Sequence, residues 1–419
     1  MGLAEEKEKY IKACLDGRLK VADGARKIGY NVKYFYTVLA RYRREGKTCL
    51  INGHRGMKYK TKKYSPDVRW IVSSVYADLF SCKISFTYQN FFYILKYVKK
   101  IDVKKGWVYK WLKSQGYKSP KCPAIRKEKK RHVPRPERLR EGELIQIDGS
   151  KHRWIKGLPP FCAHGAIDDA THSLRGLYFS VNESREGYFE MLYNMAKKGN
   201  LPQEFYSDWS SCFVAVPKSS SRMSVEEKRI FAIEHKTDFL KAVEALGIRP
   251  IFALSPQAKG RVERMWQTLQ ANLPSFFMMM NVKTIEEANS KVEWIQSWWN
   301  KEFSIAAKSP EKAYRKGMGT EDYDALFSVH ADVVTHKDGV FSYMEHDFMV
   351  DGLTIPGVKL EMQISYRSGF TVMYHGKRVK AKCIDDINME TYGDRMSITE
   401  RDILNRIYKS DMHTGFIGI

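Results

Sequence analysis

The pattern of apolar and polar residues divides the chain into a helical first part, a mixed middle part and a last part of short alternating runs. In residues 1–117, apolar residues recur three or four positions apart, the spacing that buries one face of an α-helix. This spacing predicts two groups of three helices. Their inward-facing residues are Ile11, Cys14, Leu15, Ala22, Ala25, Ile28, Val32, Phe35 and Leu39 in the first group, and Val68, Ile71, Val72, Val75, Phe91, Phe92, Ile94, Leu95, Val103, Val108, Trp111 and Leu112 in the second.

Each group has the pattern of a helix-turn-helix unit. In the first, Gly29 is the expected turn and Asn31 the expected cap of the third helix; in the second, Asp102 is the expected cap. The last helix of each unit would face a DNA groove. The outward residues are Lys33, Tyr34, Thr37 and Arg41 in the first unit, and Lys104, Lys105, Lys110 and Lys113 in the second. An ordinary three-helix bundle is the alternative, because it shares this pattern.

The middle part alternates strands with helices. The expected strands cover residues 144–148, 161–167, 174–181, 204–207 and 249–254, and the expected helices cover 186–197, 239–246 and a segment that begins between Pro256 and Gly260. The order is three strands, helix, strand, helix, strand, helix. That order is the ribonuclease-H-like layout.

Three acidic residues mark that order. Asp148 and Asp208 end two expected strands 60 residues apart, and Glu263 lies 55 residues later on the last helix. Brought together, their carboxylates would supply the hard oxygen ligands for two Mg²⁺ or Mn²⁺ ions, a pair that cuts and joins phosphodiesters. Taken singly, such an Asp is more often a turn residue and such a Glu a solvated ion pair. Asp168 and Asp169 are interpreted as turn residues.

Four short segments point to a known family. They are QIDGS around Asp148, IDDAT at 167–171, YSD ending at Asp208 and SPQAKGRVER at 255–264. In these segments the chain resembles bacterial insertion-sequence transposases of the ISNCY family, within the retroviral-integrase superfamily, and the likeness extends over residues 10–310. The resemblance implies a DDE transposase with Asp148, Asp208 and Glu263 as metal ligands. Trp209 departs from it, since many relatives have a basic residue there, and this affects local DNA contacts rather than the metal ligands.

Positive charge is concentrated in the first third of the chain. Residues 1–140 have 36 Lys and Arg against 11 Asp and Glu, whereas residues 141–419 have 35 against 37. Such a block is typical of nucleic-acid binding, with a merely soluble basic domain as the alternative. Further expected DNA contacts are Arg55 and Lys58 in a first basic linker, Lys127, Lys130 and Arg131 in a second, and Lys259, Arg261 and Arg264 beside Glu263.

The last part has short strands separated by Asp-Gly and His-Gly turns, which favours a small β-barrel. A helix is expected within residues 398–408, interpreted as a subunit contact. The fold class is therefore multidomain α+β. Its expected parts are a first helix-turn-helix domain (1–52), a basic linker (53–63), a second helix-turn-helix domain (64–117), a second basic linker (118–140), a ribonuclease-H-like DDE catalytic core (141–310), the small β-barrel (311–384) and a C-terminal tail (385–419).

These observations favour one function and leave two alternatives. We expect a DDE transposase that binds double-stranded DNA at terminal inverted repeats, nicks the ends and joins the 3′-hydroxyls to target DNA as a dimer or larger oligomer. A ribonuclease-H-like nuclease without strand transfer and a catalytically silent DNA-binding protein derived from a transposase remain possible. Seven cysteines without CxxC spacing, no long apolar run and no signal peptide favour the bacterial cytoplasm.

Overall fold

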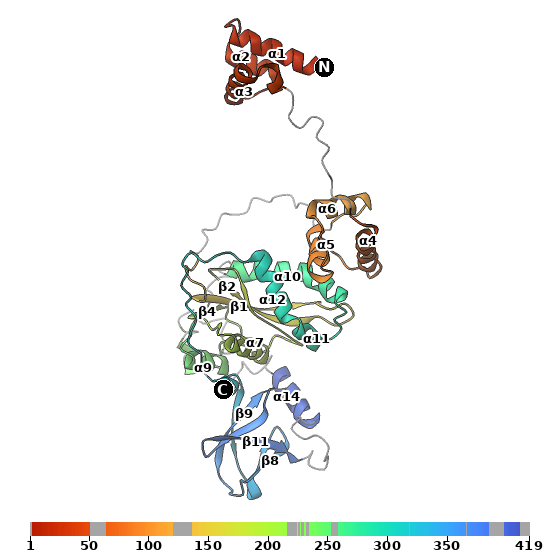
Figure 1. Ribbon diagram of the computed structural model, residues 1–419. Coiled ribbons are helices and arrows are strands. Elements are labelled where there is room, and N and C mark those ends of the chain that lie inside the picture. The colour runs from red at the N-terminus through yellow and green to blue at the C-terminus, as the bar shows by residue number, and fades with distance from the viewer. Residues whose placement is uncertain are drawn as a thin grey trace. The chain divides into compact units, whose positions relative to one another are not determined.

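The computed structural model forms two compact units, Met1–Arg69 and Trp70–Ile419 (Figure 1). The described residues are 2–50, 64–119, 136–215, 224, 227, 230–231, 234–252, 259–317, 319–365, 367–384 and 398–410. Within these ranges, no helix has the length and apolar character needed to cross a membrane. Five expected DNA contacts lie outside the described residues: Arg55, Lys58, Lys127, Lys130 and Arg131.

The first unit contains three helices, α1 (Gly2–Leu15), α2 (Val21–Ile28) and α3 (Val32–Glu45), followed by a 3-10 turn at Gly46–Leu50. As expected, Gly29 ends α2 with a φ of 80°, and the Asn31 side chain caps α3 by accepting a hydrogen bond from the backbone N–H of Lys33. Two of the residues predicted to face inward are exposed, Ala22 on α2 and, with 42% of its surface exposed, Val32. Val32 begins α3, and the helix meets the core only from Phe35 onwards.

The second unit begins within α4 (Pro66–Ser81) and continues through α5 (Tyr88–Tyr93), a π-helical turn at Ile94–Val98 and α6 (Lys105–Ser114). The expected cap at Asp102 is wrong. The cap position is Lys104, with the buried Val103 between the two, so Asp102 stands too far ahead of the helix. The Asn90 side chain on α5 donates to Asn272 Oδ1 at 2.9 Å, so these helices pack on the core helix α10 (Gly260–Met279).

The core of the second unit is a five-stranded sheet in the order β3-β2-β1-β4-β5. The strands are β1 (Leu144–His152), β2 (Phe161–Asp168), β3 (Leu174–Ser180), β4 (Glu204–Ser207) and β5 (Arg249–Phe252). Strands β1, β2 and β3 are successively antiparallel, whereas β4 runs parallel to both β1 and β5. With the helices between them, the strands follow the ribonuclease-H-like order expected from the sequence.

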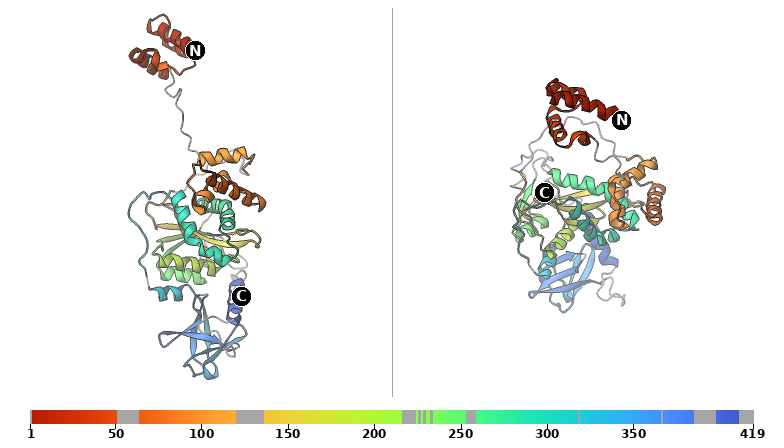
Figure 2. Two further views of the ribbon diagram at one scale, coloured as in Figure 1. Left: turned by 45° about the vertical axis from the view of Figure 1, so that its right-hand side comes forward. Right: turned by 45° about the horizontal axis from the view of Figure 1, so that its top comes forward.

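Helices cover both faces of this sheet (Figures 1 and 2). Helices α7 (Arg185–Lys197) and α9 (Asp238–Ala245) pack on one face with Ile145 and Ile147. Helix α10 packs on the other face, where a Cβ on Gly165 of β2 would come within 2.6 Å of the Trp266 ring. Two further helices, α11 (Ile285–Ser290) and α12 (Val292–Phe303), meet at Lys291 and pack along β3.

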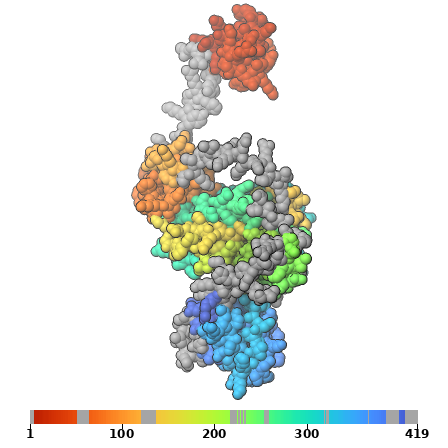
Figure 3. Space-filling model, turned by 180° about the vertical axis from the view of Figure 1, so that it is seen from behind, coloured from red at the N-terminus to blue at the C-terminus, as the bar shows by residue number. Residues whose placement is uncertain are grey.

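The last part of the chain forms a six-stranded sheet in the order β6-β9-β10-β11-β8-β7, drawn in blue in Figure 3. Its elements are α13 (Thr320–Leu326), β6 (Val329–Val334), β7 (Val340–Tyr343), β8 (His346–Val350), β9 (Lys359–Ser365), β10 (Gly369–Tyr374), β11 (Lys377–Cys383) and α14 (Ile398–Ser410). Asp338-Gly339 and His375-Gly376 turn with positive φ, as expected. Closure into a barrel remains a prediction.

Helix α14 packs on this sheet through Ile403 and Leu404, which are fully buried among the apolar side chains of the strands. The helix was interpreted as a subunit contact, but the face that carries Ile403 and Leu404 is buried within the same chain. An ion-pair cluster connects the six-stranded sheet to the core: Arg367 pairs with Glu190 on α7 and with Asp324 on α13, and Arg378 pairs with Asp324 as well. The six-stranded sheet is therefore joined to the core through charged side chains.

Candidate active site

Asp148 and Asp208 lie side by side at the end of β4. Strand β4 pairs with β1 only as far as Gln146 and Tyr206, so Asp148 and Asp208 each lie two residues beyond the last pair. Between them lies the ammonium group of Lys259, which donates to Asp148 Oδ1 at 2.5 Å and to Asp208 Oδ2 at 3.0 Å. The structure thus brings together two acids that are 60 residues apart in sequence.

Helix α10 runs along β1 and brings the third acid to the same end of the sheet. The backbone N–H of Val262 donates to Gln146 Oε1 at 3.2 Å, and Trp266 Nε1 donates to Asp148 Oδ2 at 3.0 Å. Glu263 lies between these two contacts in the first turn of α10. Its side chain is exposed and, within the described part of the chain, has no ion pair or hydrogen bond. No group of three His, Cys, Asp or Glu side chains among the described residues is arranged to hold a metal ion.

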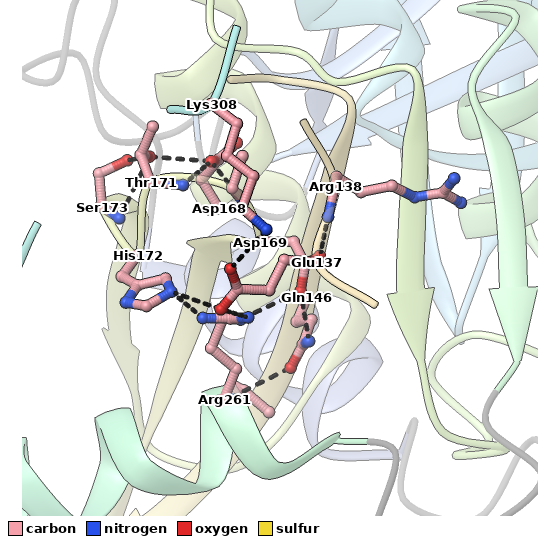
Figure 4. A network of polar contacts seen from close by, with 12 residues as sticks. Glu137, Arg138, Gln146, Asp168, Asp169, Thr171, His172, Ser173, Arg261 and Lys308 are labelled. Atoms are coloured by element: carbon pink, nitrogen blue, oxygen red, sulfur yellow. Dashed lines mark hydrogen bonds and ion pairs between the residues drawn. The ribbon is translucent and has the colours of Figure 1, made fainter. Parts of the chain in front are cut away.

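Arg261 anchors the start of α10 (Figure 4). Its Nε donates to Asp169 Oδ1 and its Nη2 to Glu137 Oε1, both at 3.0 Å. Asp169 is fully buried and also accepts hydrogen bonds from Gln146 and from the backbone of Arg138. Although Arg261 was expected to contact phosphate, its guanidinium is held inside the protein by these partners.

Asp168 has the turn role that the sequence predicts. It is buried at the end of β2 and accepts hydrogen bonds from the backbone N–H groups of Gly142, Ala170 and Thr171 at 2.7 to 3.1 Å. Asp168 and Asp169 together therefore stabilise the β2–β3 turn and the base of α10, and they take no part in the Asp148 site.

Two carboxylates, those of Asp148 and Asp208, share the single positive charge of Lys259. Burial raises the pKa of Asp148, even though Lys259 and Trp266 act in the opposite direction. Burial also opposes the charge on Lys259, but attraction by Asp148 and Asp208 outweighs it and raises the pKa of the ammonium. The two shifts therefore have different main causes, burial for Asp148 and attraction by two carboxylates for Lys259. The side chain of Lys259 is only 9% exposed.

A further carboxylate, which the sequence analysis missed, lies against the residue that follows Asp148. Glu183 lies in the loop before α7, and a Cβ on Gly149 would come within 2.5 Å of its carboxyl carbon. Gly149 directly follows Asp148. Burial raises the pKa of Glu183, and the charges of Asp148 and Asp208 raise it further. Glu183 has no strand-end position or motif to mark it, so only the fold could reveal it.

The donor chemistry of these residues, rather than their present arrangement, suits a divalent cation. The donors are carboxylate oxygens, which suit Mg²⁺ and Mn²⁺ rather than softer metals. The Lys259 ammonium already occupies the space between two of them as a cation. Asp148 and Asp208 share this single positive charge, and Glu183 lies against Gly149 nearby, so a doubly charged ion would balance the carboxylates better than the lysine does.

Most of the expected DNA contacts within the described residues are exposed. They are Lys33, Tyr34, Thr37 and Arg41 on α3, Lys104, Lys105, Lys110 and Lys113 on and before α6, and Arg264 on α10. Lys259 and Arg261 differ, because both are held by acids of the protein. No contact with DNA is established for any of these residues, and each stays a prediction.

Two curated proteins are similar to part of the chain. The "Transposase for insertion sequence IS1202" of Streptococcus pneumoniae is 35% identical over 181 residues, which is 43% of this chain and 37% of that protein. The "Putative transposase y4bF" of Sinorhizobium fredii is 35% identical over 185 residues, 44% of this chain and 38% of that protein. The chain thus spans less than two fifths of the length of these relatives. No family model matches it.

Two solved structures have a weak likeness to the chain. The HTLV-2 integrase catalytic core domain in complex with magnesium has 13% identity and a TM-score of 0.28, over 42% of this chain and 95% of that one. A chain of the simian T-cell lymphotropic virus intasome has 14% identity and a TM-score of 0.30, over 67% of this chain and 88% of that one. Scores this low support no conclusion about function.

Proposed function

We propose that this chain is a DDE transposase that binds the terminal inverted repeats of an insertion sequence, nicks the ends and joins the 3′-hydroxyls to target DNA. The observation that carries the proposal is the pairing of Asp148 and Asp208 through one buried cation, Lys259, at the end of β4. The similarity to two proteins named as transposases supports it. The ISNCY family remains part of the proposal.

Asp148, Asp208 and Glu263 are the proposed ligands of two Mg²⁺ or Mn²⁺ ions. Such ions, when bound, stabilise the attacking and leaving oxygens of a phosphodiester. Lys259 occupies the space between the two aspartates, so its side chain has to withdraw when a metal ion binds. Glu263 is exposed four residues later, in the first turn of α10. One movement at the start of α10 could therefore remove the ammonium and bring in the third carboxylate.

The proposed DNA-binding surface is the outer face of α3, with the exposed lysines of α6 as a second surface. The concentration of Lys and Arg in residues 1–140 supports it. Because two DNA ends must be held at once, we propose that the chain acts as a dimer or larger oligomer.

The test uses Asp148→Asn and Asp208→Asn in the full chain. The substrate is a plasmid with the DNA that flanks the coding sequence, and nicking and joining are measured with Mg²⁺ on gels. Each variant is expected to lose both steps on the order of a hundredfold or more, since metal stabilisation is worth several kcal/mol and each 1.36 kcal/mol is a factor of ten. Binding to the same DNA is expected to persist.

Asp332→Asn is the matched control, because Asp332 is an exposed aspartate on β6. It should retain both steps. Nicking without joining in the unmodified protein would favour a nuclease, and binding with neither step would favour a silent DNA-binding protein. Joining at normal rates by Asp148→Asn would exclude the proposed site.

A further inference from the structure

The fold alone brings Glu183 to the strand that carries Asp148, against the next residue, Gly149. Glu183 lies in the loop between β3 and α7, directly before Ser184, whose side chain caps α7. A Cβ on Gly149 would lie 2.5 Å from Glu183 Cδ, 2.6 Å from Oε1 and 2.9 Å from Oε2. The carboxyl group thus occupies the space that a side chain at position 149 would need. That space is on the α7 face of the sheet, whereas Asp148 faces α10, so the two carboxylates approach each other past the edge of β1 that β4 leaves unpaired beyond Gln146.

The loop that positions Glu183 is held on two sides. The Tyr188 hydroxyl donates to Glu183 Oε1 at 2.8 Å, and Tyr188 is itself fully buried against Phe213. The backbone N–H of Ser184 donates to Nε2 of the buried His164 on β2 at 3.2 Å. Burial lowers the pKa of His164 to about 4, so this imidazole is neutral and can accept the bond. Glu183 is therefore fixed rather than free to swing away.

The surroundings of Glu183 are unfavourable for a negative charge without a further cation. Burial raises the pKa of its carboxyl, although the hydrogen bond from Tyr188 lowers it. Asp148 and Asp208 raise it as well, and Lys259 is the opposing positive charge. Burying a carboxylate near two others is costly unless positive charge compensates. A divalent ion in place of the single ammonium would supply that compensation.

A purely structural role is the competing explanation. An acid just before a helix is favoured by the helix dipole, and Glu183 also supplies an acceptor for the buried Tyr188 hydroxyl. A glutamine would retain that acceptor. The two explanations therefore differ on whether the negative charge of Glu183 affects metal binding.

We propose that Glu183 is a fourth carboxylate of the Asp148 site and positions the metal ion by accepting hydrogen bonds from its bound water. The inference rests on the proposed function. Mg²⁺ keeps several of its waters in proteins, and loss of such an outer partner typically weakens metal affinity 10- to 100-fold.

The experiment measures Mn²⁺ affinity of the full chain by calorimetric titration without DNA. Glu183→Gln retains the size and the acceptor for Tyr188 but removes the charge, and we expect its affinity to fall about 10- to 100-fold. Gly149→Ala keeps every carboxylate but pushes the Glu183 carboxyl away, and we expect a similar fall. The clash in that variant is with the end of a flexible side chain, so the protein can relax and fold. The double variant should be no weaker than Glu183→Gln alone.

Glu190→Gln is the matched control, since Glu190 is a buried glutamate on α7, the helix that follows Glu183, and pairs with Arg367 instead. It should bind Mn²⁺ as the unmodified protein does, while thermal denaturation shows that each variant is folded. Asp148→Asn separates the two proposals. If it weakens Mn²⁺ binding while Glu183→Gln and Gly149→Ala stay within twofold of the unmodified protein, only the role of Glu183 is overturned. If the unmodified protein binds no Mn²⁺, the proposed function and this inference both fail.

Discussion

At the scale of single residues, charge type did not reveal how a side chain is used. Lys259 and Arg261 both follow from the sequence as basic residues near a candidate acid, and phosphate contact was the natural expectation. In the structure Lys259 bridges Asp148 and Asp208, and Arg261 binds Asp169. A buried cation is stable only when acids lie close to it. Lys259 and Arg261 therefore pair with acids of the protein because the side chains of both are largely buried.

Replacement of Lys259 by methionine should make metal binding tighter. Methionine has a similar length but no charge, so a metal ion no longer competes with an ammonium for Asp148 and Asp208. We expect Mn²⁺ affinity to rise about tenfold, which corresponds to 1.4 kcal/mol of competing interaction. Without metal, the variant should melt at a lower temperature, because the two aspartates lose their shared cation. Calorimetric titration and thermal denaturation in a chelator measure these two effects.

Lys151→Met is the control for this prediction, since Lys151 is exposed on β1, the strand that carries Asp148. Its Mn²⁺ affinity and melting temperature should stay unchanged. Unchanged or weaker Mn²⁺ binding by Lys259→Met would contradict the view that the ammonium occupies the metal position.

At the scale of elements, the position of α10 on the sheet determines the geometry of the site. The helix presents Trp266 to Asp148 and Gln270 to Ser150, so its contacts follow β1 along its length. Close approach is possible because β2 has a glycine, Gly165, opposite Asp148 in the ladder. A helix that begins between Pro256 and Gly260 was expected from sequence, whereas the strand along which it packs was not.

Gly165→Ala should disturb this docking. The added Cβ would lie 2.6 Å from Trp266 and 2.7 Å from Met265, both buried, so α10 must shift. We expect a loss of about 1 to 3 kcal/mol in the free energy of unfolding, the usual cost of overpacking a core. Mn²⁺ affinity should fall as well, because Trp266 supports Asp148. Urea unfolding and Mn²⁺ titration test the two parts.

Gly176→Ala offers the comparison on the other face of the sheet. Its Cβ would meet Met195 and Met191 of α7 at 2.6 and 2.7 Å, and methionine side chains adapt readily. It should cost less stability and leave Mn²⁺ affinity unchanged. Equal effects of the two variants on Mn²⁺ binding would show that the position of α10 does not determine the metal affinity of the site.

At the scale of the whole molecule, the second unit combines helices, core and six-stranded sheet through polar contacts. Asn90 joins α5 to α10, and Arg367 joins the six-stranded sheet to α7 and α13. Attraction by Arg367 and Arg378 outweighs burial and lowers the pKa of Asp324. The expected domain boundaries at residues 117 and 311 stay predictions.

Arg367→Met should destabilise the second unit. It leaves Glu190 buried without its arginine, and breaking a buried ion pair from one side costs about 3 to 5 kcal/mol. The same change at Lys382, whose pair with Asp351 is half exposed, should stay within about 0.5 kcal/mol of the unmodified protein. Urea unfolding measures both variants. A loss below about 1 kcal/mol for Arg367→Met would mean that this cluster contributes little.

The amino-acid sequence by itself determined the kinds of element and their order. Periodic apolar residues, the Asn31 cap and the positive-φ turns act over a few residues, so strands and helices of the core could be predicted closely. Asp208 follows the end of β4 as the same local pattern predicted, whereas Asp148 lies in the middle of β1, because that strand continues to His152. Small errors, at Val32 and Asp102, arose at helix starts, where a shift of one or two residues changes burial or capping.

Only the tertiary structure decided which distant residues meet. Lys259 between two aspartates, Glu183 against Gly149 and α14 against the six-stranded sheet all depend on contacts between remote segments. No local period encodes such contacts, because they arise when strands pair and helices dock. The energy that places a charged side chain depends on its burial and its neighbours, and both exist only once the chain has folded.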